Sequence, residues 1–268
     1  MTCFICPVCK SRLDRGERVY SCSNGHSFDI SKDGYVNLLM SNQSSLKRHG
    51  DDKMMVVARR SFLQKGFYEK LQQALCQVVQ AFVGSGSVIV DVGCGEGYYS
   101  KAIFESVACD FYGIDISKDA LKYASKSIKG AEFAVASAFN LPFESGSVDC
   151  VLNIFAPSPY DEFYRVLKND GVLIKAVPLE EHLWGLKSAI YEKPYKNKPE
   201  IKNEELFQLV DITEIQYELT LDNSEDILNL FKMTPYYYKT SREDTEKLTK
   251  ANSLSTTIHF GVEVYRKR

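Results

Sequence analysis

The sequence lacks any apolar run that approaches the roughly 20 residues needed to cross a bilayer. Its first segment, Met1–Cys9, has cysteines where a signal peptide would have a basic stretch followed by an apolar one. Hydrophobic residues make up 44% and charged residues 25%, which is ordinary for a globular protein. These features predict a soluble, cytoplasmic protein with no membrane partner.

The chain also lacks internal repeats, low-complexity tracts and a strong net charge. Its 33 Lys and Arg against 35 Asp and Glu give a formal net charge of -2, so any nucleic-acid-binding surface must be local. At 268 residues the chain is longer than a usual single domain of roughly 100 to 200 residues. A catalytic core with a small appendage is therefore expected.

Cysteine is present in a distribution that does not favour disulfides. Four of the eight cysteines fall within the first 22 residues, and the other four are scattered in apolar surroundings, at Cys76, Cys94, Cys109 and Cys150. In a cytosolic protein, clustered cysteines are more often metal ligands or catalytic groups than disulfide partners. The first group is therefore a candidate set of metal ligands.

A zinc-finger pattern occupies the N-terminal segment. Cys6 and Cys9 form C-x2-C, and after a gap of twelve residues Cys22 and His26 form C-x3-H. Two such pairs supply the four N and S ligands of a tetrahedral, closed and therefore structural zinc site. A redox pair at Cys6 and Cys9 is less favoured because no βαβ pattern surrounds it, and Cys3 lies one knuckle too early.

The chain divides into three regions of different character. Residues 1–40 form the predicted zinc-binding domain, since they have too little apolar content for a core of their own. Residues 41–86 hold a polar linker, about 41–55, and helices through VVARRSFL and over 68–82. From 87 to 268, short apolar strands alternate with helices and end in a β-rich segment. This pattern predicts an α/β domain with a mostly parallel, Rossmann-like sheet and a terminal strand hairpin at its edge.

A glycine-rich loop follows the first strand of the α/β domain. The segment DVGCGEG places Asp91, Gly93, Gly95 and Glu96 between a buried strand and a helix, where glycines admit close approach of a ligand and the helix N-terminus offers free N–H groups. The spacing is GxGxG, unlike the GxGxxG of dinucleotide-binding proteins. The loop resembles the first motif of class I methyltransferases, which implies S-adenosylmethionine as the cofactor.

Two further positions are predicted to contact the cofactor. Asp115 ends the second strand, where a carboxylate can accept hydrogen bonds from both ribose hydroxyls; the alternative is that it caps the next helix. Ser137 lies after the third strand, in VASAFNLPF, a stretch that resembles the adenine-contacting region of the class. Members of the class often have an acidic residue near this position, and this chain has none there.

The whole chain resembles the RlmA-type family of bacterial 23S rRNA guanine-N1 methyltransferases. The resemblance is carried by CPVC with C-x3-H, HSFDISKDGYVNLL, ARRSFLQKGFY, DVGCGEGYYS, FYGIDISK, LPF, IFAP and KMTPYYY. It implies that a methyl group is transferred to N1 of a guanine in a hairpin loop of large-subunit rRNA. It also implies that Tyr68, Gly95, Glu96 and His182 touch the cofactor, and that the protein forms a homodimer.

The substrate chemistry requires an accessible base and a proton acceptor. Guanine N1 carries a proton and lies on the Watson–Crick edge, so the base must be unpaired or flipped and a group must accept the proton. The candidates for the proton acceptor are backbone groups of the Ala156–Pro157 turn, a carboxylate or water. Local basic residues that could meet phosphates are Lys10, Arg12, Arg15, Arg18, Lys47, Arg48, Arg59 and Arg60.

Two other functions are compatible with these residues. A class I methyltransferase acting on a small molecule or a protein would have the same loop, because a fold alone does not select a substrate. A non-catalytic, zinc-containing RNA-binding module could retain the same fold without turnover. Activity on purified rRNA and a methyl-transfer assay distinguish these alternatives.

Overall fold

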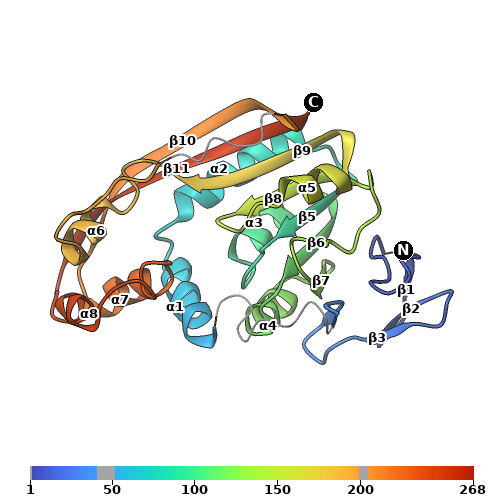
Figure 1. Cartoon of the computed structure of the whole chain (residues 1–268), viewed down its shortest axis with the longest axis horizontal. Coiled ribbons are helices and arrows are strands. Elements are labelled where there is room, and N and C mark those ends of the chain that lie inside the picture. The colour runs from blue at the N-terminus through green and yellow to red at the C-terminus, as the bar shows by residue number, and fades with distance from the viewer. Residues whose placement is uncertain (1, 41–51, 199–204) are drawn as a thin grey trace.

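The computed structural model describes residues 2–40, 52–198 and 205–268 (Figure 1). Most of the predicted linker, together with Lys47 and Arg48, lies outside these ranges. No helix within them has the length and apolar character required to cross a membrane. The chain forms a mixed sheet flanked by helices, with a small β-rich module at the N-terminus, as the sequence predicts.

The central sheet has eight strands in the order β10-β11-β9-β8-β5-β6-β7-β4. Neighbours from β4 to β9 run parallel, whereas β11 is antiparallel to both β9 and β10. The mostly parallel sheet is thus confirmed. The expected terminal hairpin is an antiparallel pair, β10 with β11, at the edge of the sheet, and residues 222–253 connect its strands in place of a tight turn. The strands are β4 Tyr35–Asn37, β5 Ser87–Val92, β6 Cys109–Asp115, β7 Glu132–Val135, β8 Val148–Ile154, β9 Leu167–Pro178, β10 Phe207–Leu221 and β11 Leu254–Lys267.

Helices cover the sheet and extend beyond one end of it. They are α1 Lys53–Gln64, α2 Glu69–Phe82, α3 Tyr98–Ser106, α4 Lys118–Ser127, α5 Tyr160–Val166, α6 Trp184–Ile190, α7 Ser224–Lys232 and α8 Arg242–Thr249. Figure 1 shows α6, α7 and α8 gathered far from the N-terminal module. Helix α1 begins inside the predicted linker because Asp52 caps it, accepting a hydrogen bond from the Met55 amide at 2.9 Å.

The N-terminal module is a three-stranded sheet that packs against the central domain. Its strands are β1 Leu13–Arg15, β2 Val19–Cys22 and β3 Ser27–Asp29. The ring of Phe4, fully buried, lies 5.1 Å from that of Tyr112 and 5.4 Å from that of Phe143. Strand β4 continues from the module and pairs in parallel with β7, so the N-terminal segment supplies the last strand of the central sheet. A domain boundary at residue 40 stays a prediction.

Candidate cofactor and metal sites

A cavity of about 930 Å³ opens at the carboxyl ends of the parallel strands. This is the edge at which open α/β sheets bind ligands, and the volume is typical of small-molecule sites. All eight residues predicted to contact the cofactor line it: Tyr68, Asp91, Gly93, Gly95, Glu96, Asp115, Ser137 and His182. The structure therefore brings together positions that are as much as 114 residues apart, from Tyr68 to His182.

The glycine loop is tied to the end of the second parallel strand. Gly95 has φ 56°, in the left-handed region, and its backbone amide donates to Asp115 Oδ2 at 2.9 Å. The amide of Ser117 donates to Asp115 Oδ1 at 2.7 Å. The alternative role for Asp115 as the helix cap is wrong, because Ser117 occupies the cap of α4 and its hydroxyl accepts from the Ala120 amide.

Asp91 places a carboxylate beneath the loop in an environment that penalises its charge. The residue is 1% exposed, and burial raises the pKa of its carboxyl to about 7 although the Ser100 hydroxyl donates to Oδ2 at 2.6 Å. The other oxygen, Oδ1, has no hydrogen-bond partner among the described residues. A buried acceptor without a donor suits a ligand that carries a cationic donor group.

Tyr68 and His182 form an aromatic wall of the same cavity. Their ring centroids are 6.3 Å apart, and Phe260 lies 5.0 Å from Tyr68 and 4.3 Å from His182. Burial lowers the pKa of His182 to about 3, so its imidazole is neutral. Its Nδ1 accepts from the His259 amide at 3.3 Å. The wall can therefore present an apolar surface without adding a charge.

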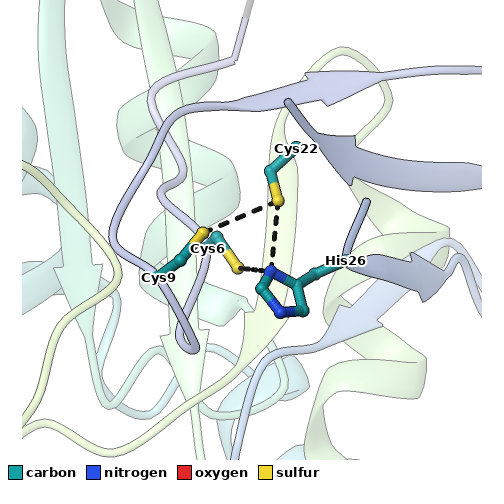
Figure 2. A group of neighbouring side chains, drawn as sticks. All are labelled: Cys6, Cys9, Cys22 and His26. Atoms are coloured by element: carbon teal, nitrogen blue, oxygen red, sulfur yellow. Dashed lines mark hydrogen bonds between the residues drawn. The ribbon is translucent and has the colours of Figure 1, made fainter. Parts of the chain in front are cut away.

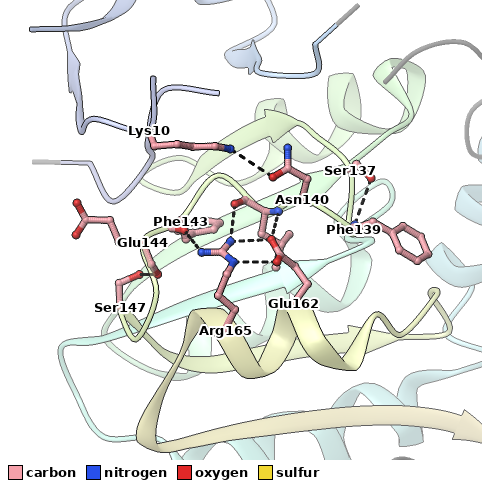
Figure 3. A network of polar contacts seen from close by, with 10 residues as sticks. Lys10, Ser137, Phe139, Asn140, Phe143, Glu144, Ser147, Glu162 and Arg165 are labelled. Carbon is pink, nitrogen blue, oxygen red and sulfur yellow. Dashed lines mark hydrogen bonds and ion pairs between the residues drawn. The ribbon is translucent and has the colours of Figure 1, made fainter. Parts of the chain in front are cut away.

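The segment that contains Ser137 is braced from two sides (Figure 3). Arg165 donates to the carbonyls of Leu141 and Phe143 at 3.0 and 2.8 Å, and its ion pair with Glu162 measures 2.7 Å. On the other side the N-terminal module contributes Lys10, whose ammonium donates to Asn140, and the Arg12–Glu144 ion pair. The residues next to the cavity, Ser137 to Phe139, thus belong to a loop held by the metal-binding module.

The four predicted metal ligands converge in the N-terminal module (Figure 2). Their ligand atoms all lie within 4.8 Å of one another. The His26 Nδ1 atom is 3.6 Å from Cys6 Sγ and 3.4 Å from Cys22 Sγ, and the Cys9 and Cys22 sulfurs are 3.7 Å apart. These distances fit the edges of a zinc tetrahedron, about 3.8 Å for S···S and about 3.6 Å for S···N from standard bond lengths.

The surroundings of the cluster favour metal binding. Hydrogen bonding to Ser11 lowers the pKa of the Cys9 thiol to about 5, which favours the thiolate that zinc requires. Among the residues that the structure describes, the cluster is made of Cys6, Cys9, Cys22 and His26. Cys3 lies outside it, and its backbone amide donates to the Tyr112 hydroxyl at 3.0 Å. The four residues predicted to bind zinc are therefore the four whose ligand atoms lie close together.

Sequence reasoning did not identify part of the cavity wall. Lys175 and Glu263 line it, as do Tyr98 and Tyr99. Lys175 could have been noticed, because it is the one charged residue in the apolar run GVLIKAVP. Asn153 serves the turn that follows β8: its amide nitrogen donates to the Pro157 carbonyl at 3.1 Å, and its oxygen accepts from the Ser158 hydroxyl at 2.8 Å.

The fold and the glycine loop define a class I S-adenosylmethionine-dependent methyltransferase. A family model described as "Methyltransferase domain" matches residues 90–175, and one described as "RlmA, N-terminal" matches residues 4–45. The chain belongs to the RlmA-type family of 23S rRNA guanine-N1 methyltransferases.

Similarity to two relatives supports this membership. A Bacillus subtilis protein, YxjB, provisionally assigned as a 23S rRNA (guanine-N(1)-)-methyltransferase, is 32% identical over 278 residues, which cover 98% of this chain and 97% of the relative. A 23S rRNA (guanine(748)-N(1))-methyltransferase of Streptomyces fradiae is 34% identical over 190 residues, which cover 69% of this chain and 66% of the relative. The first similarity spans the metal module and the catalytic domain together.

Proposed function

We propose that this chain transfers a methyl group from S-adenosylmethionine to N1 of a guanine in a hairpin loop of 23S rRNA. One observation carries the proposal: a Cys3His module and a cavity lined by a GxGxG loop occur in the same chain. That chain is similar to a relative over nearly the whole length of both. The zinc is structural, because four protein ligands leave no open position. The methyl donor supplies an electrophilic carbon activated by its sulfonium.

The residues of the cavity fit this cofactor by their chemistry. The Oδ1 atom of Asp91 is a buried acceptor suited to the cofactor's ammonium group, and Asp115 and Glu96 offer carboxylates for hydroxyl donors. Gly95, where a Cβ would have no atom within 4 Å, leaves room for a ligand to approach the backbone, whereas Gly93 packs against Ala156. Tyr68, His182 and Ser137 complete the wall. This assignment of roles is part of the proposal.

The protein contributes to the reaction by aligning the guanine with the methyl donor and by excluding water from the cavity. Displacement at a methyl carbon requires nucleophile, carbon and leaving group in line, and a site that fixes both partners supplies much of the rate. The aromatic wall, the glycine loop and the turn after β8 all line the cavity. No covalent intermediate with the protein is required.

Several of the basic residues that the sequence offers as phosphate contacts have partners within the chain. Arg12 pairs with Glu144, Arg60 lies over the Tyr123 ring at 4.8 Å, and Arg59 donates to the Met233 carbonyl at 3.3 Å. These contacts support folding of the chain itself. A cytoplasmic location and a homodimer also belong to the proposal, and the molar mass in solution tests the dimer.

The experiment that tests the function compares acceptors for a labelled methyl group. Purified enzyme is incubated with labelled S-adenosylmethionine and undermethylated 23S rRNA, 16S rRNA, a protein extract or a small-molecule extract. The proposal predicts label in 23S rRNA alone. Label in protein or small molecules would favour the broader methyltransferase alternative, and cofactor binding without any transfer would favour the non-catalytic module.

A further inference from the structure

Lys175 and Glu263 form a polar pair on the wall of the cavity. They are direct cross-strand partners on β9 and β11, and both line the same cavity as the glycine loop. Same-face partners in an antiparallel pair have Cβ atoms about 4.5–5.5 Å apart. A hydrogen-bond donor and an acceptor thus stand side by side where the cavity meets the sheet.

Neighbouring hydroxyl groups hold both side chains. Lys175 is 2% exposed, its ammonium donates to the Tyr160 hydroxyl at 2.5 Å, and it lies 4.7 Å from the centroid of that ring. The Tyr265 hydroxyl donates to Glu263 Oε2 at 2.7 Å. Burying an ammonium group is unfavourable in free energy. A buried ammonium group on the wall of a cavity can offset this cost by donating to a bound ligand.

A stacking surface begins next to Lys175. Phe155 follows β8, and its amide donates to the carbonyl of Ala176, the residue after Lys175, at 3.2 Å. It has φ 55°, a conformation that a non-glycine residue rarely adopts, and its side chain remains 45% exposed. Exposed aromatic rings are the surfaces on which unpaired RNA bases stack.

We infer that Lys175 and Glu263 read the Watson–Crick edge of the target guanine, an inference that rests on the function proposed above. Guanine presents an acceptor at O6 and donors at N1 and the 2-amino group. Lys175 donates to O6, and the Glu263 carboxylate accepts from the 2-amino group and N1. Adenine would present a donor to the ammonium and an acceptor to the carboxylate, so the pair rejects it.

Glu263 is also the proton acceptor. As N1 takes the methyl group, the electron pair of the N1–H bond forms the new N1–C bond, and the C–S pair leaves with the sulfur. The N1 proton passes to the Glu263 carboxylate and from there to water. A carboxylate that already accepts a hydrogen bond from N1 is in place for this transfer, which positioned bases accelerate by about 10²- to 10⁴-fold.

The test pairs enzyme variants with hairpins that contain guanosine or inosine at the target. Inosine keeps O6 and N1–H but lacks the 2-amino group. We expect wild type to bind the inosine hairpin about tenfold more weakly. In Glu263→Ala this penalty disappears, because the partner of the 2-amino group is gone. In Lys175→Met the penalty persists while affinity for both hairpins falls, because both retain O6.

Glu263→Gln separates recognition from proton transfer. It keeps an acceptor for the 2-amino group, so hairpin affinity stays near wild type while the single-turnover rate falls about 100-fold or more. Glu218→Gln is the matched control, since Glu218 is exposed on β10 and accepts a hydrogen bond from the Thr257 hydroxyl on β11 at 2.7 Å. It should leave both quantities unchanged.

The outcomes separate this inference from the proposed function. If wild type does not methylate guanine N1 of 23S rRNA, the proposed function fails. If wild type methylates it but Glu263→Ala retains the full inosine penalty, Lys175 and Glu263 are a structural pair and the inference is overturned. Loss of S-adenosylmethionine affinity in Glu263→Gln would also overturn it, because that result would place Glu263 at the cofactor.

Discussion

Gly93 and Ala156 approach so closely that a Cβ on the glycine would lie 2.4 Å from the Ala156 Cβ. The glycine loop after β5 and the turn after β8 are therefore in direct contact, and no larger residue fits at position 93. The contact also joins the cofactor side of the cavity to the turn beside the proposed guanine pocket.

Gly93→Ala is expected to destabilise the protein by roughly 3 kcal/mol or more, from overlap with Ala156 together with a left-handed φ of 84°. Cofactor binding should be lost as well. Gly86→Ala is the matched control, because Gly86 has φ 79° but nothing within 4 Å of a Cβ, and it should cost only about 1 kcal/mol. Equal stability of the two variants in denaturant unfolding would contradict the packing argument.

Asp115→Ala is expected to weaken S-adenosylmethionine binding roughly 10- to 100-fold, because it removes the proposed ribose acceptor and the hydrogen bond that orders Gly95. Isothermal titration calorimetry measures the change. Ser117→Ala should instead cost about 1 kcal/mol of stability through loss of the α4 cap and leave the dissociation constant unchanged. Similar losses of affinity in both variants would show that helix α4, not the carboxylate, governs binding.

The pH dependence of cofactor binding should follow the ionisation of Asp91. Its pKa is raised to about 7 by burial, so the fraction of carboxylate rises roughly tenfold between pH 6 and 8. Affinity for the cationic cofactor should increase by a similar factor, and Asp91→Asn should abolish the dependence. A flat wild-type profile would mean that the carboxylate is ionised throughout.

Stability of the ligand-free protein should change with pH in the opposite direction. An acid whose pKa is raised on folding binds more protons in the native state than in the unfolded state between the two pKa values. Asp91 therefore lowers the unfolding free energy as pH rises from about 4 to 7. Asp91→Asn should remove this part of the slope, measured by urea unfolding at several pH values.

Zinc removal should weaken cofactor binding although the metal lies outside the cavity. The module that holds the four ligands contributes Lys10 and Arg12 to the loop that carries Ser137, so its unfolding releases that loop. We expect Cys22→Ser to lose zinc and to bind S-adenosylmethionine about fivefold or more weakly. Cys3→Ser should retain both properties, because Cys3 is outside the ligand cluster. Unchanged cofactor affinity in zinc-free protein would contradict this coupling.

The sequence predicted the parts of the fold that local patterns encode. The alternating strands, the glycine loop and the spacing of Cys6, Cys9, Cys22 and His26 depend on neighbours along the chain, and the structure contains each of them. Helix α8 was not predicted, because Leu248 is its one buried residue and it lacks an apolar face. Strand β4 was not predicted because its pairing with β7 is decided by tertiary packing over about 100 residues.

Only part of the cavity wall was predicted from the sequence, because tertiary packing and not local pattern brings the rest together. Tyr68 and His182 came from family resemblance alone, since isolated aromatic residues carry no local signal of function, and the structure places both on the wall. Lys175 and Glu263 were missed because they become neighbours through antiparallel pairing of β9 with β11. In the sequence, the pair is indicated only by Lys175, the one charged residue in the apolar run GVLIKAVP.

The most direct test of the central claim is nucleoside analysis of 23S rRNA after reaction with the purified enzyme, combined with primer extension to locate the product. The account predicts 1-methylguanosine at one guanine of a hairpin loop, with a stop in primer extension at that site because the methyl group blocks Watson–Crick pairing. Zinc-loaded, cofactor-binding enzyme that leaves 23S rRNA without 1-methylguanosine would contradict it.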